Sequence, residues 1–199
     1  ADFISCSQQS YVRQYDLLAG LKKGGTFLLN TFWSDEELNT HLPASMRRYI
    51  ASNDIQFYTV DAVHIARELG LGGRFNMVMQ SAFFKLANII PIDDAVKYLK
   101  DAVVTSYGSK GEKVVNMNNG AIDHGIESLH RVNVPAEWKD AVDEEVPVNT
   151  KTPEFITKIQ NVMNRQEGDK LKISELLSME DGTFPVGGTA FEKRGTAIS

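Results

Sequence analysis

The chain has 199 residues, of which 42% are hydrophobic and 24% charged, and its formal net charge is −5. This composition is typical of a globular protein with one or two domains, and the negative charge argues against a nucleic-acid partner. One cysteine and four histidines without metal-binding spacing exclude an internal disulfide and a cysteine-ligated metal or iron–sulfur site. Without a recognisable signal peptide or an apolar stretch of transmembrane length, we expect a cytoplasmic protein with no membrane partner.

The first residues alternate short apolar strands with a helical pattern. Strands are expected at residues 3–7 and 26–30, and between them apolar side chains at helical spacing predict a helix over 11–22. Strand, helix and strand in this order form a parallel crossover unit. Because the second strand is almost continuously apolar, we expect a sheet that is covered on both faces.

Capping patterns mark the helices that follow. Ser34 and Glu37 form a capping box at the start of one short helix, and Pro43 suits the first position of the next. A third strand is expected at residues 56–60, and Asp61 caps the helix behind it. The fold class is therefore α/β: a layered sandwich with a short, mostly parallel sheet flanked by helices, followed by an irregular C-terminal arm.

A glycine-rich stretch, Gly70-Leu71-Gly72-Gly73-Arg74-Phe75-Asn76, leads into an apolar run over residues 77–90. We expect a tight turn followed by a helix that is buried on all sides. The free N–H groups of a helix start, the Arg74 guanidinium and the Asn76 amide would suit an anion or a nucleotide. The alternative is a glycine cap, a new helix and a solvated arginine.

A second candidate is an amide on a core-facing stripe. A helix is expected over residues 111–131, and Asn118 falls on the stripe formed by Val115 and Ile122. A buried amide needs partners, because leaving it unpaired costs about 1–3 kcal/mol. That partner is either a neighbouring backbone group or a ligand. Asn116 and Asn119 point elsewhere, and we expect them to be solvated.

The last third of the chain differs in character. Residues 135–152 are rich in proline and acidic residues, which favours a linker between a domain over 1–134 and a small helical or irregular arm over 153–199. The arm has too few apolar residues for a core of its own. Both ends of the chain look cut, so we expect a piece of a longer polypeptide.

The sequence contains no recognisable motif for a complete active site. A G-x-S-x-G elbow and a Walker A motif are both missing, and Cys6 at a strand end is more typical of a core thiol than of a nucleophile. We therefore assign no catalytic residue. The chain is expected to hold a ligand without transforming it.

Three segments together, with the strand region Leu21–Asn30, carry a resemblance to a known family. The chain resembles pyruvate:ferredoxin (flavodoxin) oxidoreductase, the large single-chain, multidomain form. The matching segments are Gly72-Gly73-Arg74-Phe75-Asn76-Met77 running on to Leu86, Tyr107-Gly108-Ser109-Lys110-Gly111 running on to Asn118, and Asp181-Gly182-Thr183-Phe184-Pro185 with Phe191-Glu192-Lys193-Arg194-Gly195.

The resemblance implies the later part of the γ-like third domain and the arm leading toward an iron–sulfur domain. Such enzymes are homodimers that decarboxylate pyruvate oxidatively on thiamine diphosphate, with electrons passing over [4Fe-4S] clusters to ferredoxin or flavodoxin. The acetyl group goes to coenzyme A. Thiamine diphosphate and the clusters would bind outside this chain. Which acceptor is used, and whether the substrate is pyruvate or a related 2-oxoacid, stays open.

The resemblance also implies that the third domain contributes to the coenzyme A site. The family's two coenzyme A asparagines match Asn76 and Asn118 of this sequence. Arg74 as a phosphate partner is an inference of ours from its place beside Asn76. The alternative function is a purely structural module for interdomain packing or oligomerisation, without ligand contacts.

Overall fold

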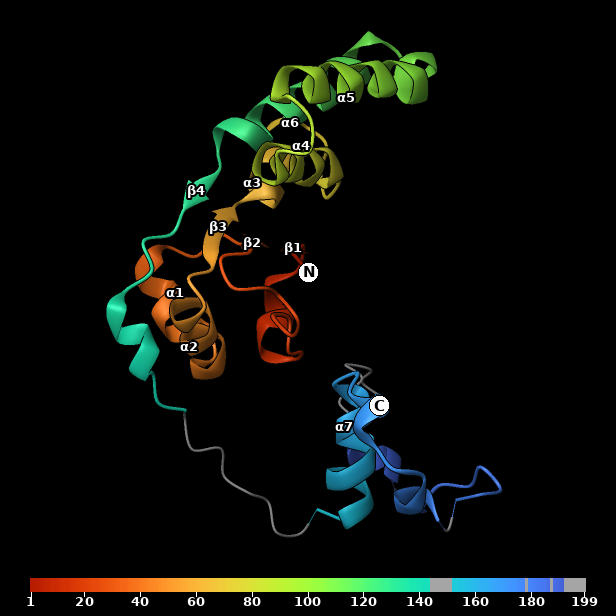
Figure 1. Ribbon diagram of the computed structural model, residues 1–199. Coiled ribbons are helices and arrows are strands. Elements are labelled where there is room, and N and C mark those ends of the chain that lie inside the picture. The colour runs from red at the N-terminus through yellow and green to blue at the C-terminus, as the bar shows by residue number, and fades with distance from the viewer. Residues whose placement is uncertain (144–151, 178, 187, 192–199) are drawn as a thin grey trace. The chain divides into compact units, whose positions relative to one another are not determined.

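The computed structural model describes residues 1–143, 152–177, 179–186 and 188–191 (Figure 1). The chain divides into two compact units, Ala1–Glu144 and Glu145–Ser199. Residues 144–151 of the predicted linker and 192–199 of the predicted arm lie outside the described residues. Within the described part of the chain, every helix is too short or too polar to cross a membrane.

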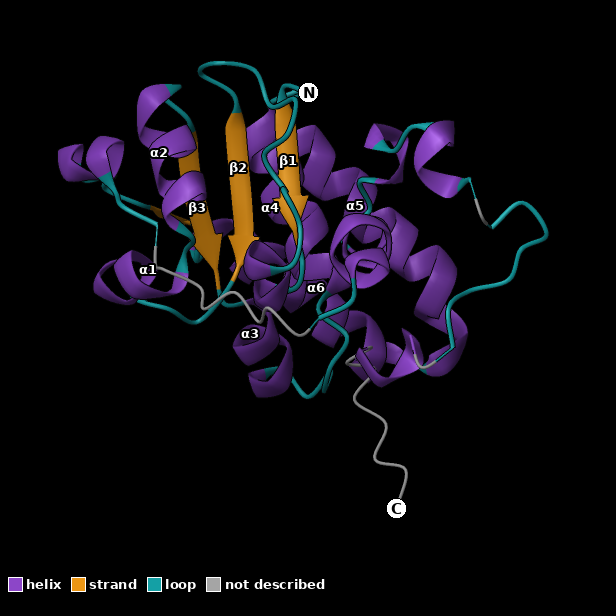
Figure 2. Cartoon of the chain, turned by 90° about the horizontal axis from the view of Figure 1, so that it is seen from below, coloured by secondary structure: helices purple, strands orange, loops and turns teal. Residues whose placement is uncertain are grey.

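The first unit is built on a four-stranded sheet in the order β1-β2-β3-β4. Three strands, β1 (Phe3–Cys6), β2 (Thr26–Asn30) and β3 (Gln56–Val60), run parallel, as the arrows in Figure 2 show. A two-residue strand, β4 (His130–Arg131), pairs antiparallel with β3. The predicted α/β class and the three predicted parallel strands are confirmed.

Both faces of the sheet are covered, as the apolar strands predict. Phe27 and Leu29 of β2 belong to one core cluster, and Leu28, which points to the opposite face, belongs to another. One cluster is completed by α1 (Asp35–His41), α2 (Ala44–Ser52) and the 3₁₀ helix η3 (Ala136–Asp140), and the other by α3 (Ala62–Glu68), α4 (Asn76–Ala87) and α6 (Glu112–Glu127).

The predicted caps are present. Ser34 Oγ accepts from the Glu37 N–H at 3.3 Å, and the Glu37 carboxylate accepts from the Ser34 N–H at 2.8 Å. Asp61 Oδ1 accepts from the His64 N–H at 2.9 Å at the start of α3. Pro43 is the N-cap of α2 rather than its first helical residue, one position earlier than predicted.

The helix predicted over residues 11–22 is wrong. The chain forms a five-residue 3₁₀ helix, η1 (Gln9–Arg13), followed by turns, and Gly20 has a φ of +77°. Turn bonds such as Leu21 N–H to Leu18 O still bring Leu18 and Leu21 into the core, each at most 2% exposed. Both leucines are therefore buried, although the segment does not form a continuous helix.

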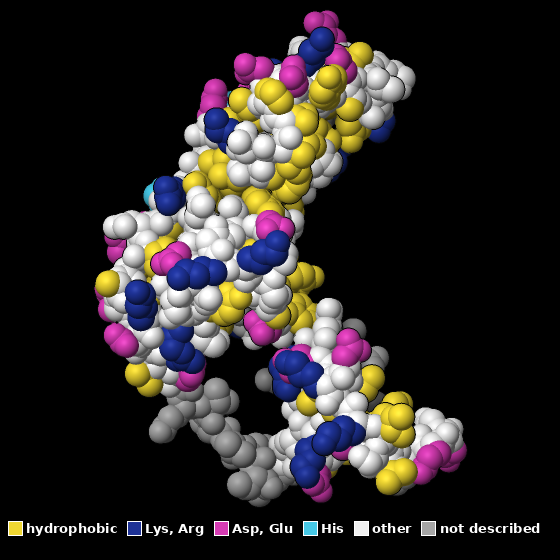
Figure 3. All heavy atoms as spheres, viewed as in Figure 1, with side chains coloured by type: hydrophobic (Ala, Val, Ile, Leu, Met, Phe, Trp, Pro, Cys, Tyr) yellow, Lys and Arg dark blue, Asp and Glu magenta, His cyan; other side chains and the backbone are white. Residues whose placement is uncertain are grey.

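Helix α4 is shorter and less buried than predicted. It ends at Ala87 because Asn88 adopts the left-handed conformation, with a φ of 47°. Val78 and Ala82 face the core, but Phe83 and Phe84 are only half-buried. Figure 3 shows hydrophobic side chains gathered over the region of α4, α6 and α5 (Ile92–Tyr107). The large exposed ones on and beside α5 are Ile89, Tyr98 and Val104.

The second unit consists of short helical pieces. A π-helical segment, η4 (Ile156–Gln160), continues into α7 (Asn161–Asn164), within the arm that the sequence predicts to be helical or irregular. Ile156 and Ile159 are buried, whereas Ile173 is 86% exposed. The remaining elements are the 3₁₀ helices η5 (Gly168–Lys170), η6 (Ile173–Leu176) and η7 (Gly188–Phe191).

The predicted boundaries at residues 134 and 152 stay predictions. Trp138, inside the predicted linker, is 1% exposed and its ring lies 6.4 Å from that of Phe57. The described start of that segment therefore packs on the first unit.

Two buried contacts hold the first unit together beyond the sheet. The Asn30 amide donates to Ser7 O at 3.0 Å and accepts from the Ala62 N–H at 2.9 Å, which ties the end of β1 to the start of α3. Helices α4 and α6 cross at Gly125, where an added Cβ would lie 2.2 Å from Ser81 Oγ and 2.5 Å from Val78 O. The absence of a side chain at Gly125 therefore sets how closely the helices approach.

We expect Gly125→Ala to lower the free energy of unfolding by about 1–3 kcal/mol, because the methyl group would force α4 and α6 apart. The matched control is Gly120→Ala on the same helix, where the nearest atom is a Leu69 methyl at 3.1 Å that can rotate away. The control should be neutral or stabilising, since alanine favours helix more than glycine. Urea denaturation measures both variants. Equal stability of the two would contradict the close crossing.

We expect Asn30→Ala to lower the free energy of unfolding by about 2–4 kcal/mol, because it leaves a carbonyl and an N–H group without their partner. Asn53→Ala is the control, since the Asn53 amide donates only to the Tyr49 carbonyl at a helix end. The control should cost less than about 1 kcal/mol. A loss at Asn30 no larger than at Asn53 would contradict the bridging role.

Candidate functional site

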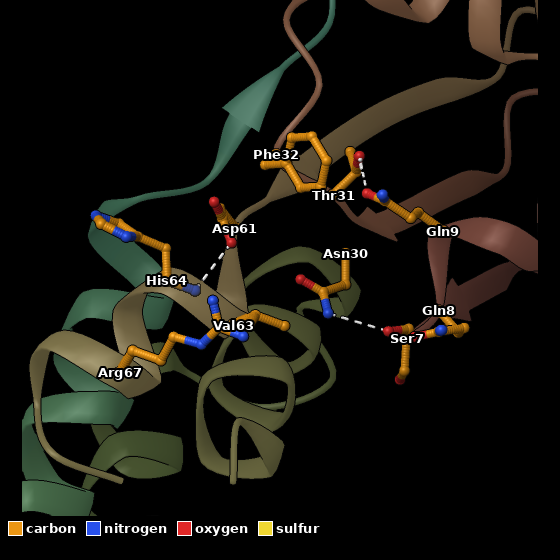
Figure 4. A pocket seen from close by; sticks show the side chains of 10 residues that line it. All are labelled: Ser7, Gln8, Gln9, Asn30, Thr31, Phe32, Asp61, Val63, His64 and Arg67. Carbon is orange, nitrogen blue, oxygen red and sulfur yellow. Dashed lines mark hydrogen bonds between the residues drawn. The ribbon is translucent and has the colours of Figure 1, made fainter. Parts of the chain in front are cut away.

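A pocket of about 410 Å³ lies where the three parallel strands end (Figure 4). Open parallel sheets bind ligands at the carboxyl ends of their strands, because the loops that follow the strands meet there. We call it the carboxyl-edge pocket. Its lining residues are Ser7, Gln8, Gln9, Asn30, Thr31, Phe32, Asp61, Val63, His64 and Arg67.

Hydrogen bonds fix one wall of the carboxyl-edge pocket. Thr31 Oγ1 donates to Gln9 Oε1 at 2.7 Å and accepts from the Trp33 N–H at 3.1 Å. Asn30 is 5% exposed, and its bonds to Ser7 and Ala62 leave no freedom for its amide to rotate. The loops after β1 and β2 are therefore joined to each other by side chains.

The opposite wall carries groups that can meet a ligand. The Phe32 ring is 66% exposed, and Asp61 uses only one carboxylate oxygen to cap α3. Among the described residues, the Arg67 guanidinium has neither a carboxylate nor a carbonyl partner. In Figure 4 the Asp61 carboxylate lies between the Phe32 ring and the Arg67 guanidinium, while the His64 ring points away from the cavity.

A second pocket of about 320 Å³ adjoins the first and shares Asp61 and His64 with it. His64 pairs with Glu68 at 3.3 Å, and His124 pairs with Glu127 at 3.6 Å, each within its own helix. In the described ranges, no three His, Cys, Asp or Glu side chains are placed to hold a metal ion. Both histidines are exposed, and each contacts a glutamate of its own helix.

The glycine-rich stretch forms the predicted turn. Gly70 and Gly72 have φ of +77° and +64°, which glycine adopts without strain. Asn76 is the first residue of α4, and its side chain is exposed. Arg74 is also exposed, with Nε donating to Leu71 O at 3.1 Å. The stretch thus presents both side chains to solvent, and their ligand roles remain predictions.

Asn118 is buried, as its place on the apolar stripe predicts, with 5% of its surface exposed. Its Nδ2 donates to Val114 O at 2.8 Å, so a neighbouring backbone group satisfies that end of the amide. Asn116 is exposed as expected. The expectation for Asn119 is wrong: the residue is half-buried, and its Oδ1 is buried and lacks a hydrogen-bond partner within the described structure.

Cys6 is a core thiol, as predicted. It is 4% exposed, and its Sγ donates to Gln8 O at 3.2 Å. Burial raises the pKa of the thiol above its usual value, and the Gln8 contact offsets only part of that rise. A thiol with a raised pKa holds less thiolate at neutral pH, which argues against a nucleophile at this place.

Sequence reasoning missed the carboxyl-edge pocket, although a signal was present. A polar residue ends or follows each predicted strand: Ser7 ends the first and lies directly after the observed β1, Thr31 follows β2 and Asp61 follows β3. Parallel strands place such positions along one edge. The prediction of a mostly parallel sheet could therefore have grouped them.

Two family models match the chain. The model for pyruvate ferredoxin/flavodoxin oxidoreductase matches residues 1–128, and a domain of unknown function named EKR matches residues 141–197. Among curated relatives, the chain is 61% identical over its whole length to the pyruvate-flavodoxin oxidoreductase of Enterobacter agglomerans and 59% identical to that of Klebsiella pneumoniae. It is 51% identical to the pyruvate:ferredoxin oxidoreductase of Moorella thermoacetica.

A solved structure shares the fold. The pyruvate oxidoreductase subunit PORC of Thermotoga maritima superposes with a TM-score of 0.52 over 65% of this chain and 64% of that subunit, at 18% identity. The chain spans 17% of the length of each of the three relatives named above. Since the first family model covers residues 1–128, the chain belongs to the pyruvate ferredoxin/flavodoxin oxidoreductase family.

Proposed function

We propose that this chain is a segment of a pyruvate:ferredoxin or pyruvate:flavodoxin oxidoreductase whose helices α4 and α6 contribute Asn76 and Asn118 to the coenzyme A site. The full enzyme would decarboxylate pyruvate oxidatively, pass electrons to ferredoxin or flavodoxin and transfer the acetyl group to coenzyme A. The observation that carries the proposal is the identity of 51–61% to such enzymes along the whole chain.

The placement of the two amides is compatible with a shared ligand. Helices α4 and α6, which carry them, cross in direct contact at Gly125. Asn76 stands in the first turn of α4, where free N–H groups favour negative charge. Asn118 uses Nδ2 for Val114 O, and its Oδ1 has no partner among the described residues. That oxygen is available to accept a hydrogen bond from an amide or hydroxyl of coenzyme A.

Arg74 extends this proposal to a phosphate of coenzyme A. It is exposed two residues before Asn76, and the bond from its Nε to Leu71 O leaves the terminal nitrogens free to meet a phosphate. The same geometry also suits a solvated arginine.

The second candidate is a structural module for packing between domains or subunits. Its support is the apolar surface around α4 and α5, where Ile89, Tyr98 and Val104 are each more than half exposed. In that case the bond from Asn118 to Val114 would be the only role of the amide. Coenzyme A kinetics distinguish the two candidates.

The other cofactors are assigned outside this chain. A [4Fe-4S] cluster needs four cysteine thiolates, and the sequence provides Cys6 alone, which is 4% exposed. The residues present therefore do not fit a cluster, and we place thiamine diphosphate in other domains as well. The partners in this proposal are those domains, ferredoxin or flavodoxin, and a second copy in a cytoplasmic homodimer.

In the full-length enzyme, we expect Asn118→Ala and Asn76→Ala each to raise the KM for coenzyme A by about two- to tenfold, the effect of one lost hydrogen bond. Pyruvate decarboxylation, followed without coenzyme A, should stay at the wild-type rate. Asn116→Ala on the exposed side of α6 is the matched control and should leave the KM unchanged.

Steady-state kinetics with coenzyme A as the varied substrate measure these effects, and thermal unfolding checks that each variant is folded. If both variants keep the wild-type KM, the amides have no role in coenzyme A binding and the structural candidate is preferred.

A further inference from the structure

The carboxyl-edge pocket is not used by the proposed coenzyme A contacts, because neither Asn76, Asn118 nor Arg74 lines it. Its volume of about 410 Å³ falls within the range of small-molecule sites in proteins. Two of its polar side chains are committed to the protein: Asn30 to Ser7 and Ala62, and Thr31 to Gln9 and Trp33. The other lining side chains, among them Phe32, Asp61 and Arg67, remain for a ligand.

Three of these groups define the chemistry of the ligand. The Arg67 guanidinium is a planar donor fork that matches a phosphate or a carboxylate, and within the described structure it has no ion-pair partner. The second carboxylate oxygen of Asp61 can accept from a hydroxyl group. The Phe32 ring is 66% exposed and offers a face on which a planar group can stack.

The combination excludes simpler ligands. A bare inorganic anion would meet Arg67 but would also face the negative charge of Asp61, and it would leave Phe32 uncovered. A purely apolar ligand would bury the charges of Asp61 and Arg67 without pairing them, which is costly. A ligand with a planar ring, hydroxyl donors and a terminal anion satisfies all three groups.

We propose that the carboxyl-edge pocket binds a nucleoside monophosphate, with the base on Phe32, the ribose hydroxyls on Asp61 and the phosphate on Arg67. The order of these side chains along the pocket wall in Figure 4 is the order of base, ribose and phosphate in such a ligand. A carboxylate that follows a parallel strand and accepts from ribose hydroxyls is a known device of nucleotide-binding α/β folds. The proposal needs no contact with Asn76 or Asn118.

The test is titration of adenosine 5′-monophosphate into the full-length enzyme by calorimetry. Arg67→Ala should raise the Kd by about ten- to a hundredfold, the cost of a lost charge-assisted bond pair. Phe32→Ala should raise it by about tenfold, the value of stacking one base. Lys97→Ala, an exposed lysine of α5 outside the pocket, is the control and should leave the Kd unchanged.

Two further measurements make the assignment specific. Arg67→Lys keeps the charge but not the fork, so its Kd should lie between those of wild type and Arg67→Ala, and it replaces the alanine variant if that one unfolds. The 2′,3′-dideoxy form of the nucleotide should bind more weakly than the parent, because it has no hydroxyl for Asp61.

A failure of the nucleotide proposal can be distinguished from a failure of the proposed function. The nucleotide proposal rests on the proposed function only for the identity of the enzyme that is tested. If the nucleotide does not bind, or binds equally to wild type, Arg67→Ala and Phe32→Ala, the pocket assignment is overturned. If Asn118→Ala or excess coenzyme A abolishes nucleotide binding while Arg67→Ala does not, the ligand sits at the coenzyme A site and the pocket assignment is again overturned. Another domain filling the pocket in a full-length structure would also overturn it.

Discussion

Strand β2 is the constraint on which the rest of the first unit depends. It pairs with β1 on one side and β3 on the other, and Phe27, Leu28 and Leu29 are fully buried in succession. Since neighbouring side chains of a strand point to opposite faces, these three residues pack against the helical layers on both faces of the sheet. A shift of one residue in its pairing would exchange the two clusters, so the register is strongly specified.

The two proposed ligand regions follow from this layered arrangement. The carboxyl-edge pocket lies where β1, β2 and β3 stop, and the Asn30 amide holds its floor by bonds to two neighbouring segments. The coenzyme A contacts are assigned instead to α4 and α6, whose approach is set by Gly125. One site therefore depends on the ends of strands, and the other on a helix crossing. Side-chain changes at one need not disturb the other.

Local signals in the sequence were reliable, and signals that depend on tertiary structure were not. The three parallel strands, the Ser34 cap and the Asp61 cap are encoded within a few residues, and all were predicted. The segment 11–22 has helical spacing, but burial of Leu18 and Leu21 is achieved by turns, which a pattern of apolar residues cannot distinguish from a helix. The end of α4 depends on one left-handed residue, Asn88.

For the candidate sites, the residue types could be predicted but not their surroundings. The burial of Asn118 follows from its stripe, whereas its bond to Val114 and the buried Asn119 oxygen depend on how α6 meets its neighbours. The carboxyl-edge pocket combines segments that follow three different strands, so no single stretch of sequence predicts it.

The strand order has a consequence for how the chain folds. β1, β2 and β3 are neighbours in the sheet in the same order as in the sequence, whereas β4 joins only when His130 reaches Thr59. Contacts that close long loops form slowly, because the loop entropy is lost before the contact is gained. Assembly should therefore spread outward from β2, with the return of the chain at β4 and the docking of Trp138 among the last events. The indole of Trp138 is then a natural fluorescent reporter of completion.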